Sequence, residues 1–208
     1  MIDKIDGILQ KNDFIKKIKE KIHHGNESFT IASIDIDNFQ TVNRYYGEQV
    51  GDQVIKKIAS ILKQNIFKND VVGRGNKDEF NVLLTNSSIE TGFIRVEEIR
   101  KYLDKHTFRM GDKKSDIDIK ISGGLANYPK HARNVEELVK AADGALFRAK
   151  REGKNRIYLA EDEGMVLRSN YYTKTQLEKL MELSKKTYKT EEFLLREAID
   201  DLLEKYRK

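Results

Sequence analysis

Acidic side chains stand where an apolar stretch ends, and their spacing suits chemistry with a bound cation. Residues 28–36 are mostly β-branched and apolar, which is typical of a buried strand. This stretch ends in Asp35 and Asp37. Because side chains alternate along a strand, both carboxylates are predicted on one face of its carboxyl end.

A second acidic pair, Asp78 and Glu79, lies between the apolar stretches 71–72 and 80–84, at the expected tip of a hairpin. If the strands are neighbours, this pair meets Asp35 at one edge of a sheet. Three carboxylates there repel one another unless a divalent cation lies between them. Oxygen ligands with open coordination positions suit Mg²⁺ carrying nucleotide phosphates.

Composition excludes several classes of protein. The chain has 208 residues, 35% of them charged, with a formal net charge of +5. Because it has no cysteine, it has no disulfide and no thiolate metal site. The sequence contains no apolar run long enough to span a membrane and no signal-peptide pattern at its start, so a cytoplasmic location is expected. The mild positive charge permits a nucleic-acid partner without requiring one.

Four motifs in order resemble the GGDEF domain of diguanylate cyclases, over roughly residues 3–159. The motifs are the segment Asp35-Ile36-Asp37-Asn38-Phe39 with Asn43, Gly47, Gly51 and Asp52; the hairpin Asp78-Glu79-Phe80; Ser122-Gly123-Gly124 with Tyr128-Pro129; and Ala142-Asp143 with Ala149 to Arg156. The resemblance implies guanine nucleotide as a partner. Because Asp3 lies almost at the start of the sequence, no upstream sensory domain is expected.

The resemblance assigns the acidic residues to metal and catalysis. Asp35 and Glu79 match the residues that bind Mg²⁺, with help from the carbonyl of Ile36. Asp78 matches the position that assists deprotonation of the 3′-hydroxyl, which attacks the partner's α-phosphate in active enzymes.

The same resemblance assigns four residues to the nucleotide itself. Asn43 and Asp52 match the pair that reads the edge of guanine, because an amide and a carboxylate complement its donors and acceptor. Lys150 and Lys154 match the residues that hold the terminal phosphates.

The chain departs from the family at the reacting phosphate. Asn76 and Lys77 replace the two glycines before the acidic pair, and Gln40 replaces a phosphate-binding lysine. Asparagine tolerates positive φ, so Asn76 is expected to keep the turn, whereas the stem of Lys77 is expected to fill space needed by the α-phosphate or ribose. Since small misplacements slow catalysis strongly, impaired condensation is predicted. The family's inhibitory Arg-x-x-Asp site falls on residues 67–70, where the arginine is absent.

Hydrophobic spacing predicts helices over residues 11–23, 49–66, 88–104 and 135–152, and a half-buried alternating strand over 116–126. Helices alternating with strands and one hairpin predict an α/β sandwich with a mixed central sheet over residues 1–159.

The composition then changes. An acidic linker at 160–164 leads to a strand–helix–helix unit at 165–208, with a capping-box pattern from Thr173 to Gln176. This unit is too small to bury its apolar faces alone, so a homodimer through 165–208 is expected.

The 165–208 unit resembles ribbon-helix-helix modules of the CopG/Arc/MetJ type, which bind DNA through a two-stranded ribbon. The polar ribbon residues are Arg168, Ser169, Asn170 and Tyr171. The strand pattern pairs Arg168 with Asn170, whereas alignment on Thr173 selects Leu167, Ser169 and Tyr171, so the base-reading face stays open.

Three hypotheses follow. The first is a dimeric DNA-binding transcription regulator with a degenerate, non-catalytic GGDEF domain that binds GTP or cyclic di-GMP. The second is an active diguanylate cyclase dimerised by its C-terminal module. The third is an oligomerisation scaffold that binds neither ligand nor DNA.

Overall fold

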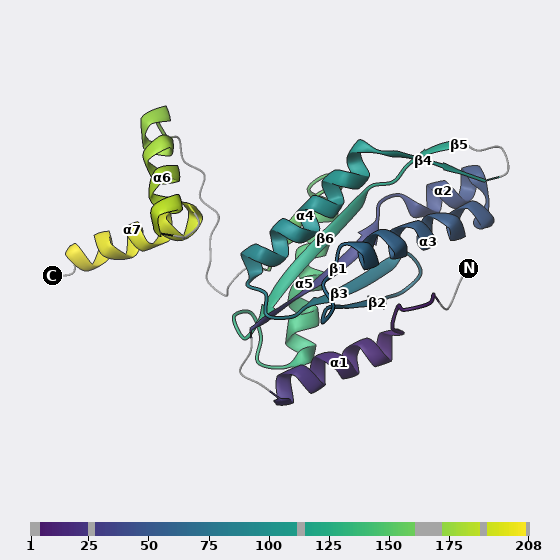
Figure 1. Ribbon diagram of the computed structural model, residues 1–208, viewed down its shortest axis with the longest axis horizontal. Helices are drawn as coiled ribbons and strands as arrows, with labels where there is room; N and C mark the ends of the chain where they lie inside the picture. The colour runs from purple at the N-terminus through teal and green to yellow at the C-terminus, as the bar shows by residue number, and fades with distance from the viewer. Residues whose placement is uncertain (1–4, 25–27, 112–114, 161–171, 188–190, 207–208) are drawn as a thin grey trace. The chain divides into compact units, whose positions relative to one another are not determined.

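The computed structural model describes residues 5–24, 28–111, 115–160, 172–187 and 191–206 (Figure 1). Its contacts divide the chain into two compact units, residues 1–165 and 166–208. The elements of the first unit, in chain order, are α1 (Lys11–His24), β1 (Phe29–Ile36), α2 (Phe39–Tyr46), α3 (Glu48–Gln64), β2 (Val71–Arg74), β3 (Glu79–Leu84), α4 (Ile89–Lys105), β4 (Thr107–Met110), β5 (Ser115–Asp118), β6 (Ile121–Tyr128), α5 (Val135–Arg151) and β7 (Ile157–Leu159).

Five strands form a mixed sheet in the order β2-β3-β1-β6-β7. The β2–β3, β3–β1 and β1–β6 pairs are antiparallel, and β6–β7 is parallel. Every residue of β1 is buried, as expected of a central strand covered on both faces. The predicted α/β sandwich with a mixed sheet is confirmed.

Alternation along β1 sends its side chains to two separate cores. Phe29 and Ile31 pack with residues of α1 and α5, whereas Ile34 and Ile36 pack with residues of α3 and α4. Ser33 and Asp35 have the same parity as Ile31, so they face α5. The Ser33 hydroxyl accordingly donates to Asp143 Oδ1 on α5 at 2.7 Å.

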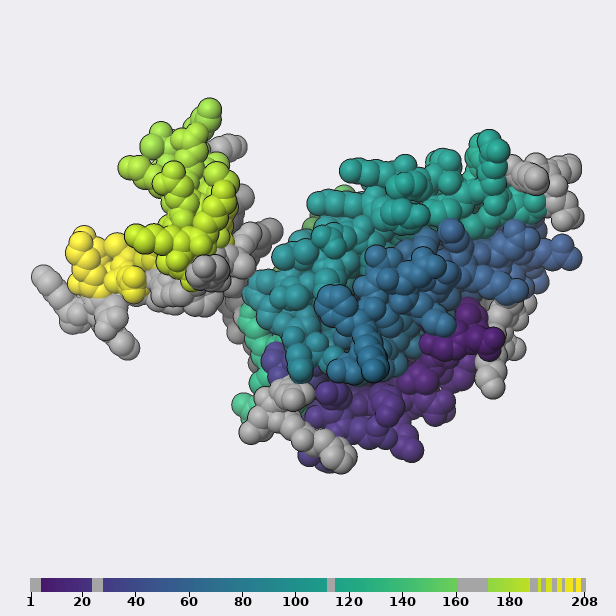
Figure 2. Space-filling model, in the orientation of Figure 1, coloured from purple at the N-terminus to yellow at the C-terminus, as the bar shows by residue number. Residues whose placement is uncertain are grey.

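The strand predicted over 116–126 is wrong in its extent. Residues 115–118 belong to a small hairpin in which β5 pairs with β4, and β6 begins at Ile121 in the main sheet. β6 is buried from Ile121 to Asn127 and does not alternate, because α4 and α5 both pack on it. Figure 2 shows α2, α3 and the β4–β5 hairpin forming one continuous part of the surface of this unit.

The second unit contains two described helices, α6 (Lys174–Thr187) and α7 (Glu191–Lys205). The predicted capping box at the start of α6 is confirmed: Gln176 N–H donates to Thr173 Oγ1 at 3.2 Å, and Thr173 N–H donates to Gln176 Oε1 at 2.9 Å. The predicted ribbon strand lies outside the described residues. None of the described helices is long and apolar enough to cross a bilayer.

Candidate functional site: an acidic sheet edge beside two lysines

The sheet places Asp35 directly opposite Glu79, because these residues are register partners where β1 and β3 meet. The Ile36 N–H donates to the Asp78 carbonyl at 3.3 Å, so the pairing continues to the tip of the hairpin. The acids that sequence analysis placed on separate stretches therefore meet at one edge of the sheet.

Lys150, in the last turn of α5, is the direct partner of Asp35. Its Nζ lies 2.6 Å from Asp35 Oδ2, and the Asp35 side chain is 9% exposed. Burial raises the pKa of Asp35 to about 6; Lys150 opposes the rise, and the charges of Asp78 and Glu79 add to it. A cation beside Asp35 would offset both the cost of burying the charged carboxylate and its repulsion by Asp78 and Glu79.

The carboxylates fit Mg²⁺ in their chemistry, since they lie on two paired strands next to Lys150, a lysine that the family resemblance assigns to phosphate. The carboxylates do not form a closed cluster: among the described residues, no three acidic or histidine side chains gather closely enough to hold a metal by themselves. Open positions of this kind suit a cation that arrives with nucleotide phosphates and keeps them as ligands.

The hairpin turn closes without the two glycines. Glu79 N–H donates to the Asn76 carbonyl at 2.7 Å, and Gly75 N–H donates to the Glu79 carbonyl at 2.9 Å. The expectation that Asn76 would take the positive φ is wrong, because Lys77 takes it, with φ 41°. The Lys77 carbonyl accepts a hydrogen bond from the buried Arg74, whose guanidinium lies over the Phe80 ring at 4.7 Å.

The side chain of Glu79 is held by the turn. Its Oε2 accepts from Asn76 N–H at 3.2 Å. A Cβ on Gly75 would lie only 2.7 Å from the Glu79 Cβ, so the glycine at 75 keeps room for this carboxylate. Lys77 itself is exposed.

Asn43, on α2, carries a buried Oδ1 that has no hydrogen-bond partner among the described residues. A Cβ on Gly51 would lie 1.8 Å from this oxygen, so the glycine is what admits the amide. Asp52 follows on α3 and is half-buried. A buried, unsatisfied carbonyl oxygen carries a free-energy cost that a ligand N–H would remove.

Lys154 and Gln40 lie close to the acidic edge in the sequence of elements that follows β1 or contacts it. Lys154 Nζ donates to Asn38 Oδ1 at 2.6 Å, immediately after β1. Gln40 is exposed on the first turn of α2, the helix that follows β1. Two positions that the family resemblance links to phosphate therefore lie beside the end of β1.

Sequence analysis did not foresee the role of Asp37. Its carboxylate is buried and accepts from Ser122 Oγ at 2.7 Å and from Asn155 N–H at 2.8 Å, so it links the end of β1 to β6 and to the loop after α5. No sequence signal distinguished Asp37 from Asp35, since both carboxylates end the same predicted strand.

Asp70, at the position of the family's inhibitory motif, makes contacts that stabilise the fold. Its Oδ2 accepts from Arg95 at 2.6 Å and its Oδ1 accepts from Thr85 N–H at 2.8 Å. Arg95 on α4 also lies over the Phe67 ring at 4.0 Å. Phe67 thus occupies the position at which the family motif has its arginine.

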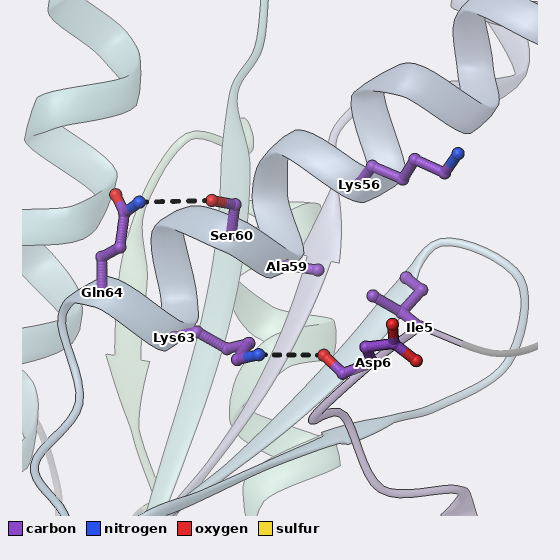
Figure 3. A pocket seen from close by; sticks show the side chains of 7 residues that line it. All are labelled: Ile5, Asp6, Lys56, Ala59, Ser60, Lys63 and Gln64. Carbon is purple, nitrogen blue, oxygen red and sulfur yellow. Dashed lines mark hydrogen bonds between the residues drawn. The ribbon is translucent and has the colours of Figure 1, made fainter.

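The predicted DNA-reading residues Arg168, Ser169, Asn170 and Tyr171 lie outside the described part of the chain. A cavity of about 420 Å³ lies away from the acidic edge, between α3 and the turn before α1 (Figure 3). Lys63 crosses it to donate to the Asp6 carbonyl at 2.9 Å.

The chain is similar to known proteins in sequence and in fold. The family described as "Diguanylate cyclase, GGDEF domain" matches residues 1–156. Diguanylate cyclase A of Treponema denticola is 33% identical over 136 residues, which cover 65% of this chain and 36% of that protein. The chain spans about a third of the length of the curated relatives it matches.

Solved structures show the same fold. The crystal structure of the GGDEF domain of PA1120 (YfiN or TpbB) from Pseudomonas aeruginosa has a TM-score of 0.71 and 27% identity, covering 76% of this chain and 99% of that one. The GGDEF domain of DgcB from Caulobacter crescentus, solved in complex with c-di-GMP, has a TM-score of 0.69 at 24% identity, covering 77% of this chain and 97% of that one, and shares the fold. The chain belongs to the GGDEF domain family of diguanylate cyclases.

Proposed function

We propose that the chain is a dimeric transcription regulator whose GGDEF domain binds Mg²⁺ and guanine nucleotide (GTP or cyclic di-GMP) but condenses GTP poorly or not at all. Its C-terminal unit would then bind DNA as the output. The observation that carries nucleotide binding is the buried, unpartnered Oδ1 of Asn43. Guanine offers N–H donors that would satisfy it, and Asp52 would accept from the same edge.

Impaired condensation is supported by the charge and strain at the hairpin. Gln40 supplies no positive charge where the family has a lysine. Lys77 places a long side chain at the tip of the turn, in a conformation that costs an L-residue about 1–2 kcal/mol. Displacement of the reacting phosphate by a fraction of an ångström would slow the reaction strongly.

The active diguanylate cyclase remains the second candidate, favoured by a specific observation. The turn is closed by the Asn76–Glu79 backbone hydrogen bond despite its two substitutions, and Lys77 is exposed. A side chain that points to solvent would leave Asp78 and Glu79 available to substrate.

Dimerisation is supported by the exposed apolar side chains of α6 and α7. Among the described side chains of this unit, only Leu194 is a buried hydrophobic residue. The exposed set comprises Tyr172, Leu177, Met181, Leu183, Ile199, Leu202, Leu203 and Tyr206. A second copy of the same helix pair would cover these surfaces with matching ones.

DNA binding rests on the sequence resemblance of the unit. Residues 165–208 carry ten Lys and Arg against eight Asp and Glu, so overall charge contributes little and the ribbon must supply most of the contacts.

One titration tests the whole proposal: GTP and cyclic di-GMP added to the full chain, with and without mixed-sequence DNA. We expect a dimer, salt-sensitive DNA retention, and a change in that retention when nucleotide binds. A chain cut after Leu159 should be monomeric and should not bind DNA. A truncated chain that stays dimeric contradicts the assigned interface, and absence of both nucleotide and DNA binding favours the scaffold hypothesis.

A further inference from the structure

Asn155 lies in the loop between α5 and β7 and joins three parts of the first unit. Its backbone N–H donates to Asp37 Oδ2 at 2.8 Å. Its Nδ2 donates to Asp104 Oδ1 at 2.8 Å, and its Oδ1 accepts from Arg100 Nη1 at 2.9 Å. The backbone therefore anchors the loop to the end of β1, and the side chain anchors it to α4.

Each partner of Asn155 is itself held in place. Asp37 is buried and also accepts from Ser122 Oγ. Arg100 donates twice to Glu97, at 2.8 and 2.9 Å. The hydrogen bond from Asn155 is the largest of the influences that lower the pKa of Asp104.

The loop needs this support because its backbone is unusual. Gly153, Lys154 and Asn155 are consecutive residues with φ of 115°, 62° and 47°. Only the first is a glycine, and left-handed conformations of other residues persist where surrounding contacts determine them. Lys154, in the middle of this run, reaches Asn38 at the end of β1.

We propose that Asn155 is a positioning residue for the terminal phosphates of a bound nucleoside triphosphate. Through its side-chain bonds to α4 it fixes the loop conformation that aims Lys154 at the acidic edge. This inference rests on the proposed nucleotide binding and adds to it a residue that acts through Lys154.

Three variants separate its contributions. Asn155→Ala removes the side-chain bonds and disfavours the left-handed backbone, whereas Asn155→Gly removes the side-chain bonds and keeps the backbone permitted. Asn86→Ala is the matched control, because Asn86 is an exposed asparagine with φ 49° in the turn at the far end of β3 from Glu79.

The affinities of GTP and GMP for each full-length variant, measured calorimetrically with Mg²⁺, test the proposal. We expect both Asn155 variants to lose GTP affinity by about tenfold, which corresponds to one charge-assisted contact, with GMP affinity nearly unchanged. Asn86→Ala should retain both affinities. Equal losses for GTP and GMP indicate general damage and overturn the proposal, as does wild-type GTP affinity in Asn155→Gly.

Hydrogen exchange of residues 152–156 without nucleotide gives an independent readout. It should be several-fold faster in both Asn155 variants than in wild type or Asn86→Ala; unchanged exchange overturns the positioning role even when GTP binds. If the wild-type chain binds no nucleotide, the proposed function and this inference both fall, and that result is visible in the wild-type titration alone.

Discussion

Lys150 Nζ lies 2.6 Å from Asp35 Oδ2, so the lysine expected to hold phosphate neutralises the carboxylate expected to hold Mg²⁺. A cation that arrives without nucleotide must displace this lysine. A cation that arrives with phosphates gives the lysine a new partner at the same moment. The contact therefore favours joint binding of metal and nucleotide over binding of either alone.

Replacing Lys150 by methionine should strengthen binding of Mn²⁺ in the absence of nucleotide by about tenfold, because Asp35 loses its competing partner. Electron paramagnetic resonance of free Mn²⁺ measures this directly. Lys154→Met removes the same charge nearby, but its Nζ bonds to Asn38 and not to Asp35, so it should change the affinity little. Equal gains in both variants would attribute the effect to net charge.

Asp35 should make stability depend on pH. Its pKa rises from 3.8 to about 6 on folding, so its favourable contribution is complete below pH 3.8 and is lost as the pH rises through 6. Asp35→Asn carries no charge at any pH. The variant should therefore exceed wild type in unfolding free energy above pH 6 by on the order of 1–2 kcal/mol, after allowance for screening, and by nothing at pH 3.5.

Urea denaturation at pH 3.5 and 7.5 without Mg²⁺ checks this expectation. Asp116→Asn is the control, since Asp116 is an exposed carboxylate paired with Arg109. A pH-independent difference between wild type and Asp35→Asn would contradict it.

Gly51→Ala should damage guanine recognition, because the new Cβ would lie 1.8 Å from Asn43 Oδ1 and force the amide to move. We expect GTP affinity to fall by about 10- to 100-fold while ATP affinity changes less, which corresponds to a lost buried hydrogen bond. Gly144→Ala is the matched control, as its Cβ would meet no atom within 4 Å. Unchanged preference for GTP over ATP in Gly51→Ala would show that Asn43 does not read the base.

Lys77→Gly tests the steric hypothesis. Glycine relieves the positive φ, so the free energy of unfolding should rise by about 1 kcal/mol whatever the function. If the lysine stem blocks the phosphate, synthesis of cyclic di-GMP should also rise, by about 10²-fold. Asn86→Gly is the control in another turn with a similar φ; because asparagine tolerates positive φ, it should change stability little and leave synthesis unchanged. A stabilised Lys77→Gly chain without added synthesis would remove Lys77 as the cause.

The order of motifs was sufficient to predict the sheet and the meeting of Asp35 with Glu79, because strand neighbours and alternation determine both. The motif order could not show that Asp35 lies at the acidic edge whereas Asp37 makes structural hydrogen bonds. Both carboxylates end the same strand, and the contacts of Asp37 with Ser122 on β6 and with Asn155 in the loop after α5 appear only in the folded chain.

Turn conformation was also beyond the pattern. Residue preference favoured Asn76 for the positive φ, yet Lys77 is the residue that adopts it. In this conformation the Lys77 carbonyl accepts from Arg74, and Glu79 N–H donates to the Asn76 carbonyl. The alternation over 116–126 likewise predicted one strand, because the break between two sheets at Ile119 and Lys120 carries no glycine or proline.

The proposed function requires that this domain hold guanine nucleotide without joining two of them. Incubation of the full-length chain with GTP and Mg²⁺, with bound nucleotide and cyclic di-GMP quantified in the same samples, tests it most directly. We expect saturable GTP binding with no cyclic di-GMP above background. Cyclic di-GMP formed over many turnovers would contradict it.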